Sequence, residues 1–431
     1  MFRPITKWNT SVHSPGTIPE IVHKAFKLAA AEKPGATHVE LPEDIAGRDT
    51  AQVPFRAPAR FRRPVPDPET VGRALALLGE SEAPIVLAGN GCIRTRTSRE
   101  LNAFVENTGI FVANTFMGKG ALSADNARCL YAAGLGSRDH VTEAFERADL
   151  VLCIGYDMIE WPPDRWNVGR DKRIIHIDFE PAEVDDHYQV DVELVGDLAS
   201  GLAAINARLG PEHRKQTALY RHLREQMTAD LHEHDNDDSF PMKPQRILSD
   251  LRAALRAEDI LISDVGAHKM WVARHYPVYQ PGSCIISNGF CSMGIAVPGA
   301  ISAKRTFPGR RVVGLVGDGG FLMNVQELAT AVQYRIPATI LVWEDGAYGL
   351  IAWKQQARYG KTSHVEFANP DLVRVSEAFG CHGIRVGSAA ELTPALESAF
   401  DETDRPSVIV VDVDYTENMK LTQHLGELIS H

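Results

Sequence analysis

The stretch VVGLVGDGGFLMNVQELATAVQYRIPATILVWEDGAYGL, residues 312–350, decides the fold that we expect for this chain. Its two apolar runs, residues 312–316 and 338–343, have the composition of strands buried in a parallel sheet. The apolar face between them predicts a helix over about residues 324–334, which Pro337 ends. Two parallel strands joined by a helix form one crossover unit, so the sequence predicts an α/β fold with doubly wound parallel sheets.

An aspartate beside glycine follows each of these strands. Asp318 lies in GDGG (residues 317–320), and Asp345 lies in EDG (residues 344–346). Glycine lets the backbone turn sharply and lets a ligand come close. Adjacent parallel strands end at one edge of a sheet, where ligands bind, so we expect the two carboxylates to meet. Such a pair suits Mg²⁺, which takes oxygen ligands. The alternative is that Asp318 is a turn residue and Asp345 a helix cap.

The order GDG, helix, strand, then two polar residues before x-x-Tyr-Gly resembles the fingerprint of thiamine diphosphate enzymes. The segment GDGGFLMNVQELATA (residues 317–331) is similar to acetolactate synthases in particular. This resemblance implies that Asp318, Asp345 and the backbone carbonyl of Ala347 bind Mg²⁺. The common family pattern has Asn-Asn where this chain has Glu344-Asp345. Aspartate at the second position also occurs in the catabolic branch, and it remains a hard oxygen ligand.

Two further segments carry the resemblance. DVGAH (residues 264–268) matches a D-x-G-x-H segment, in which backbone amides and His268 are implied to meet the diphosphate. Amides at a helix N-terminus suit an anion, although His268 could also face solvent from that helix. In SNGFCSMG (residues 287–294), Met293 is implied to prop the cofactor in its V shape, and the alternative is core packing. The implied cofactor-binding residues are Val265, Gly266, Ala267, His268, Cys291, Ser292, Met293, Asp318, Gly319, Gly320, Asp345, Ala347, Tyr348, Gly349 and Leu350.

Residues 1–50 resemble only the last part of the pyrimidine-binding domain of acetolactate synthases. We expect a helix at residues 19–31 and a strand at residues 36–41, which cannot bury a core of their own, so the strand should expose an unpaired edge. The earlier strands of that domain, and the family's cofactor-activating glutamate, are expected to be absent from this chain. Lys7 lies in the family's I-T-K segment at the rim of the substrate channel; the alternative is a solvated surface lysine.

The rest of the chain divides by composition and periodicity. A Pro- and Arg-rich linker is expected before the strand–helix alternation of a central, Rossmann-like domain, and a charged helix and acidic loop are expected before the diphosphate-binding domain. The expected segments are residues 1–50, a pyrimidine-domain remnant; 51–69, the linker; 70–206, the central domain; 207–242, the connecting helix and loop; and 243–431, the diphosphate-binding domain.

Within the central domain, IGYDMIEW (residues 154–161) resembles catabolic acetolactate synthases, which lack a flavin-contacting sequence there, so FAD is not expected. GNG (residues 89–91) lacks the third glycine of a dinucleotide fingerprint. Asp178 follows a predicted strand and either holds a ribose hydroxyl or caps a helix. Trp161 and Trp166 are most simply explained by packing.

Composition excludes several classes of function. The chain has 431 residues, 44% of them hydrophobic, and a formal net charge of −11, which argues against nucleic-acid binding as its main role. No run is long and apolar enough to cross a membrane, and the N-terminus lacks a signal-peptide core. The six cysteines are scattered, so we expect buried free thiols in a cytoplasmic protein. The 16 histidines show no HExxH spacing, so a zinc site is not expected.

The resemblance implies a thiamine diphosphate- and Mg²⁺-dependent transferase that decarboxylates pyruvate and ligates it to a second pyruvate, giving 2-acetolactate and CO₂. Lys354, beside Trp353, stands where biosynthetic synthases have a tryptophan, which favours pyruvate as both donor and acceptor. A homodimer or homotetramer is implied, in acetoin or branched-chain amino acid biosynthesis. Two alternatives stay open: another thiamine diphosphate-dependent 2-keto acid decarboxylase or carboligase, and a truncated chain that binds the cofactor without activity. By the resemblance, Met293 and Lys7 are the catalytic candidates within this chain.

Overall fold

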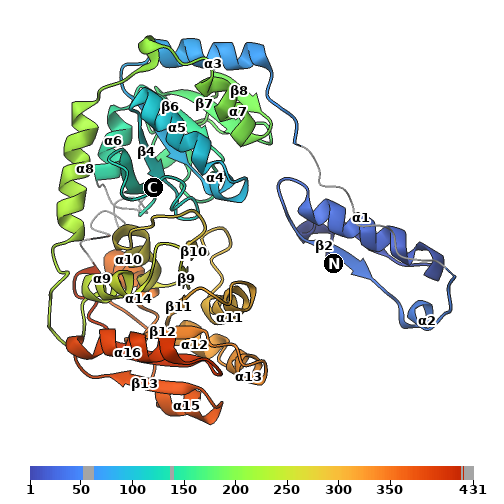
Figure 1. Cartoon of the computed structure of the whole chain (residues 1–431), viewed down its shortest axis with the longest axis vertical. Helices are drawn as coiled ribbons and strands as arrows, with labels where there is room; N and C mark the ends of the chain where they lie inside the picture. The colour runs from blue at the N-terminus through green and yellow to red at the C-terminus, as the bar shows by residue number, and fades with distance from the viewer. Residues whose placement is uncertain (52–62, 136–139, 419–420, 422–431) are drawn as a thin grey trace.

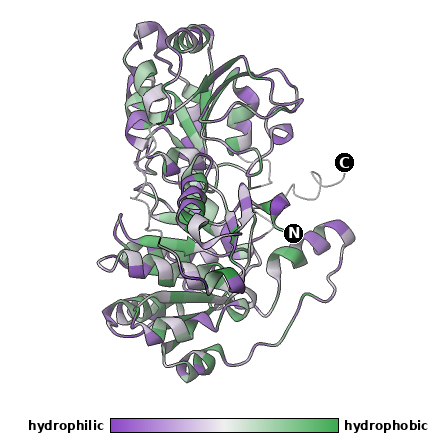
Figure 2. Cartoon of the chain, turned by 90° about the vertical axis from the view of Figure 1, so that its right-hand side faces the viewer, coloured by the Kyte–Doolittle hydropathy of each residue, from purple (hydrophilic) through white to green (hydrophobic). Residues whose placement is uncertain are grey.

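A computed structural model of the chain describes residues 1–51, 63–135, 140–418 and 421. Two six-stranded sheets and one two-stranded sheet form its layers, and every strand pair within them is parallel. Helices cover both faces of each large sheet (Figure 1). Hydrophobic residues are concentrated in the strands, and hydrophilic residues in the outward faces of the helices (Figure 2). The predicted α/β class with parallel sheets is therefore confirmed.

The central sheet has the order β5-β4-β3-β6-β7-β8. Its inner strands are buried on both faces, as continuous apolar runs in a parallel sheet should be. The strands are β3 (Pro84–Ala88), β4 (Phe111–Asn114), β5 (Cys129–Ala132), β6 (Leu150–Ile154), β7 (Arg173–Asp178) and β8 (Val192–Val195). The helices are α3 (Pro68–Glu80), α4 (Asn90–Arg94), α5 (Ser98–Thr108), α6 (His140–Arg147), α7 (Leu198–Asn206) and α8 (Ala218–Leu231), with short 3₁₀ turns at Pro163–Arg165 and Pro211–His213.

The C-terminal sheet has the order β10-β9-β11-β12-β14-β13. Its strands are β9 (Ile260–Ser263), β10 (Cys284–Ile286), β11 (Val312–Gly317), β12 (Thr339–Glu344), β13 (His382–Val386) and β14 (Ser407–Asp412). The helices are α9 (Pro244–Ala254), α10 (Ala267–His275), α11 (Ala296–Thr306), α12 (Asp318–Met323), α13 (Glu327–Gln333), α14 (Gly349–Tyr359), α15 (Leu372–Ala378) and α16 (Ala389–Asp401). Among the helices of the described residues, none is both long and apolar enough to cross a bilayer.

Strands β11 and β12 are neighbours in this sheet, as the opening stretch predicts. Gly317 pairs with Trp343, so the two strands end side by side. The helix predicted over about residues 324–334 corresponds to α13, but the sequence did not predict the separate helix α12, which starts at Asp318. Glycine is a poor helix former, but here tertiary contact requires it. A Cβ on Gly320 would run into the carboxylate of Asp264.

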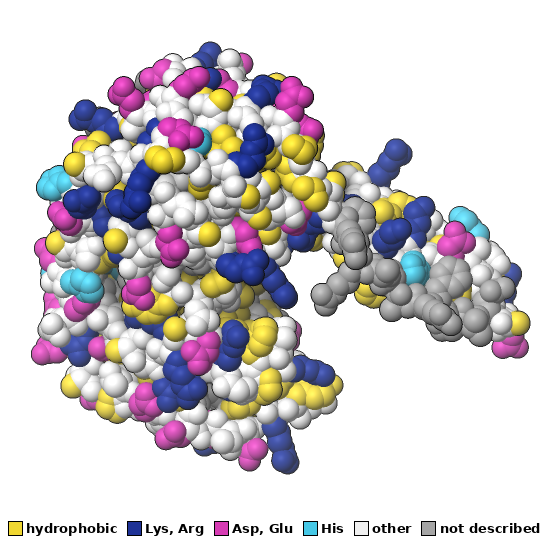
Figure 3. Space-filling model, turned by 45° about the horizontal axis from the view of Figure 1, so that its top comes forward, with side chains coloured by type: hydrophobic (Ala, Val, Ile, Leu, Met, Phe, Trp, Pro, Cys, Tyr) yellow, Lys and Arg dark blue, Asp and Glu magenta, His cyan; other side chains and the backbone are white. Residues whose placement is uncertain are grey.

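The N-terminal part forms a separate small unit beside the body of the molecule (Figures 1 and 3). It contains β1 (Trp8–Ser11), β2 (Thr37–Glu40), α1 (Ile18–Ala30), α2 (Glu43–Ala46) and the 3₁₀ turns Arg3–Ile5 and Pro15–Thr17. The predicted strand at 36–41 does not stand alone, since β1, which the sequence analysis missed, pairs with it along one edge. The buried hydrophobic residues of this unit are only Val12, Ala25 and Ile45.

The carboxylates of Glu32 and Glu180 join the N-terminal unit to the central part, and Glu180 contacts the ammonium group of Lys33 at 3.9 Å. Glu32 accepts hydrogen bonds from Arg63 at 2.6 Å and from the Nε of Arg94 at 3.0 Å. Arg63 also pairs with Asp197 at 3.3 Å. Of the predicted linker, residues 52–62 lie outside the described residues, and its last part runs from Arg63 into α3.

Candidate functional site

A cavity of about 90 Å³ opens at the carboxyl edge of the C-terminal sheet, where β9, β11 and β12 end. Every implied cofactor-binding residue lines it except Cys291 and Ser292. The lining is completed by Gly317, Ile351 and Tyr415, which were not among the implied cofactor-binding residues. Residues from 265 to 415 thus converge on one point, as expected at the strand ends of an open α/β sheet.

The carboxylate of Asp318 is buried and fixed by four hydrogen bonds. One oxygen accepts from the backbone N–H groups of Gly346 (2.7 Å) and Asp345 (3.2 Å) and from the side-chain amide of Asn369 (2.7 Å). The other oxygen accepts from the N–H of Gly319 at 2.7 Å. Asp318 is therefore the first residue of a helix and clamps the loop after β12, so the simple turn alternative is wrong. Asn369, which the sequence analysis missed, has no local motif that could have revealed it.

Asp345 lies in the same cavity, close enough for the two carboxylates to interact. Burial, and then the negative charge of Asp318, raise the pKa of Asp345 to about 7. Among the described residues, no group of three or more His, Cys, Asp or Glu side chains surrounds a metal position. Two carboxylates with a backbone carbonyl still fit Mg²⁺, because this ion commonly uses one or two carboxylates and completes its shell with phosphate oxygens and water.

His268 is buried, with 3% of its surface exposed, so the alternative of a solvent-facing helix residue is wrong. Burial lowers the pKa of His268 to about 3, and a hydrogen bond to the backbone of Asp264 opposes this shift only in part. Its Nε2 atom has no hydrogen-bond partner among the described residues. A buried polar atom without a partner is one that a bound ligand can satisfy. An anion at Nε2 would favour the protonated ring and raise this pKa.

Glycines make room around this nitrogen and at the start of α10. A Cβ on Gly266, just before the nine-residue helix, would lie 2.7 Å from Cε1 of His268, and one on Gly317 would lie 3.3 Å from the same ring atom. A Cβ on Gly349 would lie 2.9 Å from a carboxylate oxygen of Asp345. The N-terminus of α10, the orphaned His268 nitrogen and these glycines together fit a bound diphosphate.

Met293 lines the cavity because two side chains fix its loop. Asp264 accepts hydrogen bonds from the N–H groups of Gly294 at 2.9 Å and Ala296 at 3.2 Å, and burial raises its pKa. Asn324 donates to the carbonyl of Gly294 at 2.9 Å. Asp264 is thus an anchor of the Met293 loop and not a member of the cavity wall.

The structure does not bring Lys7 to this cavity. Its ammonium group donates to the carbonyls of Ala31 and Lys33, both at 2.8 Å, within the N-terminal unit. Cys291 and Ser292 lie outside the cavity wall on an exposed part of the Met293 loop. The expectation that all six cysteines are buried is wrong for Cys291, and it holds for the other five.

In the central sheet, glycines serve backbone packing. Gly89 and Gly91 lie against the backbone of Gly155, where any Cβ would collide. Asp178 ends β7 and accepts a hydrogen bond from the N–H of Phe179 at 2.6 Å, and no helix starts there, so the helix-cap alternative is wrong. The predicted packing role of the tryptophans is confirmed, since Trp161 and Trp166 are buried against Phe145 and each other. A hollow of about 80 Å³ lies beside Asp178.

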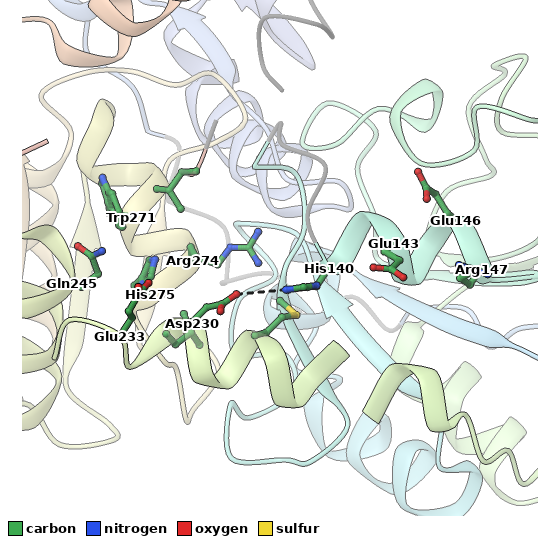
Figure 4. A pocket seen from close by; sticks show the side chains of 13 residues that line it. His140, Glu143, Glu146, Arg147, Asp230, Glu233, Gln245, Trp271, Arg274 and His275 are labelled. Atoms are coloured by element: carbon green, nitrogen blue, oxygen red, sulfur yellow. Dashed lines mark ion pairs between the residues drawn. The ribbon is translucent and has the colours of Figure 1, made fainter. Parts of the chain in front are cut away.

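A larger hollow, about 770 Å³, lies between helices α6 and α8 of the central part and α9 and α10 of the C-terminal part. Figure 4 shows its acidic and basic side chains facing one another across the space, with His140 paired to Asp230 at 3.5 Å. The residues of this hollow coincide with none of the implied cofactor-binding residues. The strand-end cavity therefore remains the candidate site.

Comparison with known proteins agrees with this choice. The thiamine pyrophosphate enzyme C-terminal TPP-binding domain matches residues 264–411, and the thiamine pyrophosphate enzyme central domain matches residues 71–205. The acetolactate synthase of Bacillus subtilis (strain 168) is 34% identical over 443 residues, covering 100% of this chain and 76% of that protein. The catabolic acetolactate synthase of Raoultella terrigena is 33% identical over 446 residues, covering 100% of this chain and 78% of that protein. The acetolactate synthase large subunit of Corynebacterium glutamicum is 31% identical over 424 residues, covering 94% of this chain and 67% of that protein.

Proposed function

This chain belongs to the acetolactate synthase family of thiamine pyrophosphate enzymes, and from that premise we propose that it binds thiamine diphosphate with Mg²⁺ and converts two pyruvate molecules into 2-acetolactate and CO₂. We assign residues 243–431 as the diphosphate-binding domain and residues 70–206 as the central domain, connected by residues 207–242. Residues 1–50 correspond to the last part of a pyrimidine-binding domain, joined through residues 51–69.

The observation that carries the proposal is the meeting of the buried Asp318 carboxylate and the Asp345 carboxylate with an orphaned histidine nitrogen in one glycine-lined cavity. Asp318, Asp345 and the carbonyl of Ala347 would hold Mg²⁺. His268 and the N-terminus of α10 would bind the diphosphate. The cation would relieve the mutual repulsion of the two carboxylates, and Mg²⁺ commonly binds phosphate oxygens in addition to one or two carboxylates.

Thiamine diphosphate, when bound, supplies the electron sink that decarboxylation of a 2-oxo acid requires. The chain's own residues fix its position and exclude water. Met293 stands on a loop held by Asp264 and would support the cofactor ring. Leu350 and Ile351, at the start of α14, close the cavity with apolar surface. A low-dielectric site of this kind favours loss of CO₂ from a charged carboxylate.

A second candidate function also has an observation in its favour. In the part of the chain that the structure describes, no glutamate lines the cavity that could activate the aminopyrimidine. A cofactor-binding chain without activity is therefore the competing proposal. For the active enzyme we propose a homodimer or homotetramer. The exposed side chains of Phe290 (94%) and Ile351 (48%), beside the cavity, support this association.

Two measurements test the proposals. Calorimetry of thiamine diphosphate binding, with Mg²⁺ and with EDTA, should show Mg²⁺-dependent binding. A colorimetric acetoin assay with pyruvate, on protein free of host acetolactate synthase, should then show acetolactate. Binding without acetolactate would favour the inactive cofactor-binding chain, and absence of binding would contradict both.

A further inference from the structure

Lys269 follows His268 in helix α10, and only 5% of its surface is exposed. Its ammonium nitrogen donates to the side-chain oxygen of Asn288 at 2.8 Å and contacts the sulfur of Cys291 at 3.5 Å. No carboxylate among the described residues lies within ion-pair distance of this nitrogen. A lysine is almost never buried unless an acid pairs with it. The positive charge of Lys269 therefore lacks a direct counter-ion within the described chain.

The neighbouring charges do not supply that counter-ion. The carboxylate of Glu160 is buried and already accepts from the hydroxyl of Thr115 at 2.7 Å and from the N–H of Met117 at 2.8 Å. Burial lowers the pKa of Lys269. The sulfur of Cys291 opposes this shift, the like charge of Lys354 on α14 adds to it to a lesser extent, and Glu160 opposes it least. An anion beside this ammonium group would offset the unfavourable burial of its charge.

The chain places this ammonium group next to the candidate site, although Lys269, Asn288 and Cys291 are not among the residues that line the cavity. Lys269 is adjacent in sequence to His268, whose ring lines the cavity, and Cys291 lies two residues before Met293, which also lines it. The sulfur of Cys291 is a weak hydrogen-bond acceptor, so an anion that replaced this contact would gain a stronger bond to the ammonium group. Asn288 would keep the lysine in place, because its side-chain oxygen accepts the hydrogen bond from the ammonium group.

We propose that Lys269, positioned by Asn288 beside Cys291, forms a subsite that binds the carboxylate of a 2-oxo acid substrate. The inference rests on the proposed function for its choice of substrate class. The diphosphate is assigned to His268 and the start of α10, so the charge of Lys269 is available to the second anion of the reaction. No bond is made or broken at Lys269, and its role is to hold the substrate carboxylate.

The exposed Cys291 gives a direct readout, because the other five cysteines are buried. The rate at which iodoacetamide alkylates Cys291, followed by mass spectrometry, reports whether the subsite is filled. Oxamate, an unreactive carboxylate with the shape of pyruvate, should slow alkylation, and the neutral pyruvamide should not. Replacing the charge in Lys269→Met should raise the oxamate concentration for half-protection by about 10- to 100-fold, the effect of losing a hydrogen bond to a charged group.

Two further variants keep the test falsifiable if Lys269→Met is unstable. Lys269→Arg keeps the charge and should retain protection. Lys304→Met is the matched control, since Lys304 is also partly buried and donates only to the carbonyls of Pro308 (3.0 Å) and Arg310 (2.8 Å), away from the cavity. Equal protection by oxamate in Lys269→Met, or none in the unmodified protein, would overturn the inference.

Calorimetry with thiamine diphosphate and Mg²⁺ on the same proteins separates this inference from the proposed function. If the cofactor does not bind but oxamate protection depends on Lys269, the proposed function fails and the carboxylate subsite stands. If the cofactor binds to the unmodified protein and Lys269→Met weakens that binding 10-fold or more without changing oxamate protection, Lys269 serves the diphosphate and the inference is wrong.

Discussion

Replacing Asp318 by asparagine tests the metal site most sharply. In the structure one carboxylate oxygen of Asp318 accepts three hydrogen bonds and the other accepts one, from Gly319 at 2.7 Å. Asparagine is nearly the same shape and keeps the three bonds with its single oxygen. Its amide then faces the N–H of Gly319, so one charge-assisted bond is lost. The free energy of unfolding without ligands should fall by about 1.5–3 kcal/mol.

The same substitution should also weaken cofactor binding. Asp318→Asn removes one of the two negative charges that face the cation, while Asp345 and the shape of the cavity remain. Loss of an outer-shell partner typically weakens metal binding by about 10- to 100-fold, and loss of a direct ligand should cost no less, so Mg²⁺-dependent affinity for thiamine diphosphate should fall at least about 10-fold. Isothermal titration calorimetry measures this affinity, and urea unfolding measures the stability.

A matched control comes from the neighbouring strand. Asp412 ends β14, next to β12, and pairs with Arg385 at 3.0 Å outside the cavity. Asp412→Asn should leave cofactor affinity unchanged. The assignment of Asp318 to the metal is refuted if Asp318→Asn folds and binds thiamine diphosphate with unchanged affinity and unchanged dependence on Mg²⁺.

Three further predictions concern pH, packing and flavin. The pKa of His268 in the folded chain, about 3, lies below its ordinary value of 6.5. As the pH falls, the ring therefore binds a proton in the unfolded chain before it does so in the folded chain, and the folded state loses stability between pH 6.5 and pH 3. The free energy of unfolding of His268→Phe, measured with urea and compared with that of the unmodified protein, should therefore become more favourable to the variant by roughly 3 kcal/mol from pH 7 to pH 4. A difference that does not change with pH would contradict the buried neutral ring. In Gly320→Ala the new Cβ meets the Asp264 carboxylate, so the free energy of unfolding should fall by about 1–3 kcal/mol. In Gly309→Ala the new Cβ has nothing within 4 Å, so the free energy of unfolding should fall much less. Equal shifts in melting temperature would argue against the close approach at Gly320. Purified protein should carry no FAD, and a stoichiometric flavin absorbance retained through gel filtration would disprove this.

Much of the fold follows from local sequence. The apolar runs at 84–88, 150–154 and 260–263 coincide with strands β3, β6 and β9, because continuous apolar segments bounded by polar residues fit a sheet buried on both faces. The crossover spacing between Asp318 and Asp345 likewise placed both carboxylates at one sheet edge, since adjacent parallel strands end together. These features depend only on composition and period along the chain.

Tertiary structure alone decided the details of the site. The bond from Asn369 to Asp318 joins residues 51 positions apart, and the pairing of β1 with β2 joins segments on either side of α1. Helix α12 has two glycines directly after its first residue, which local propensity disfavours, because a side chain would collide with Tyr348 at Gly319 and with Asp264 at Gly320. The burial of His268 and Lys269 depends on what packs over α10. Such contacts arise only when distant segments fold together, so no local pattern of residues encodes them.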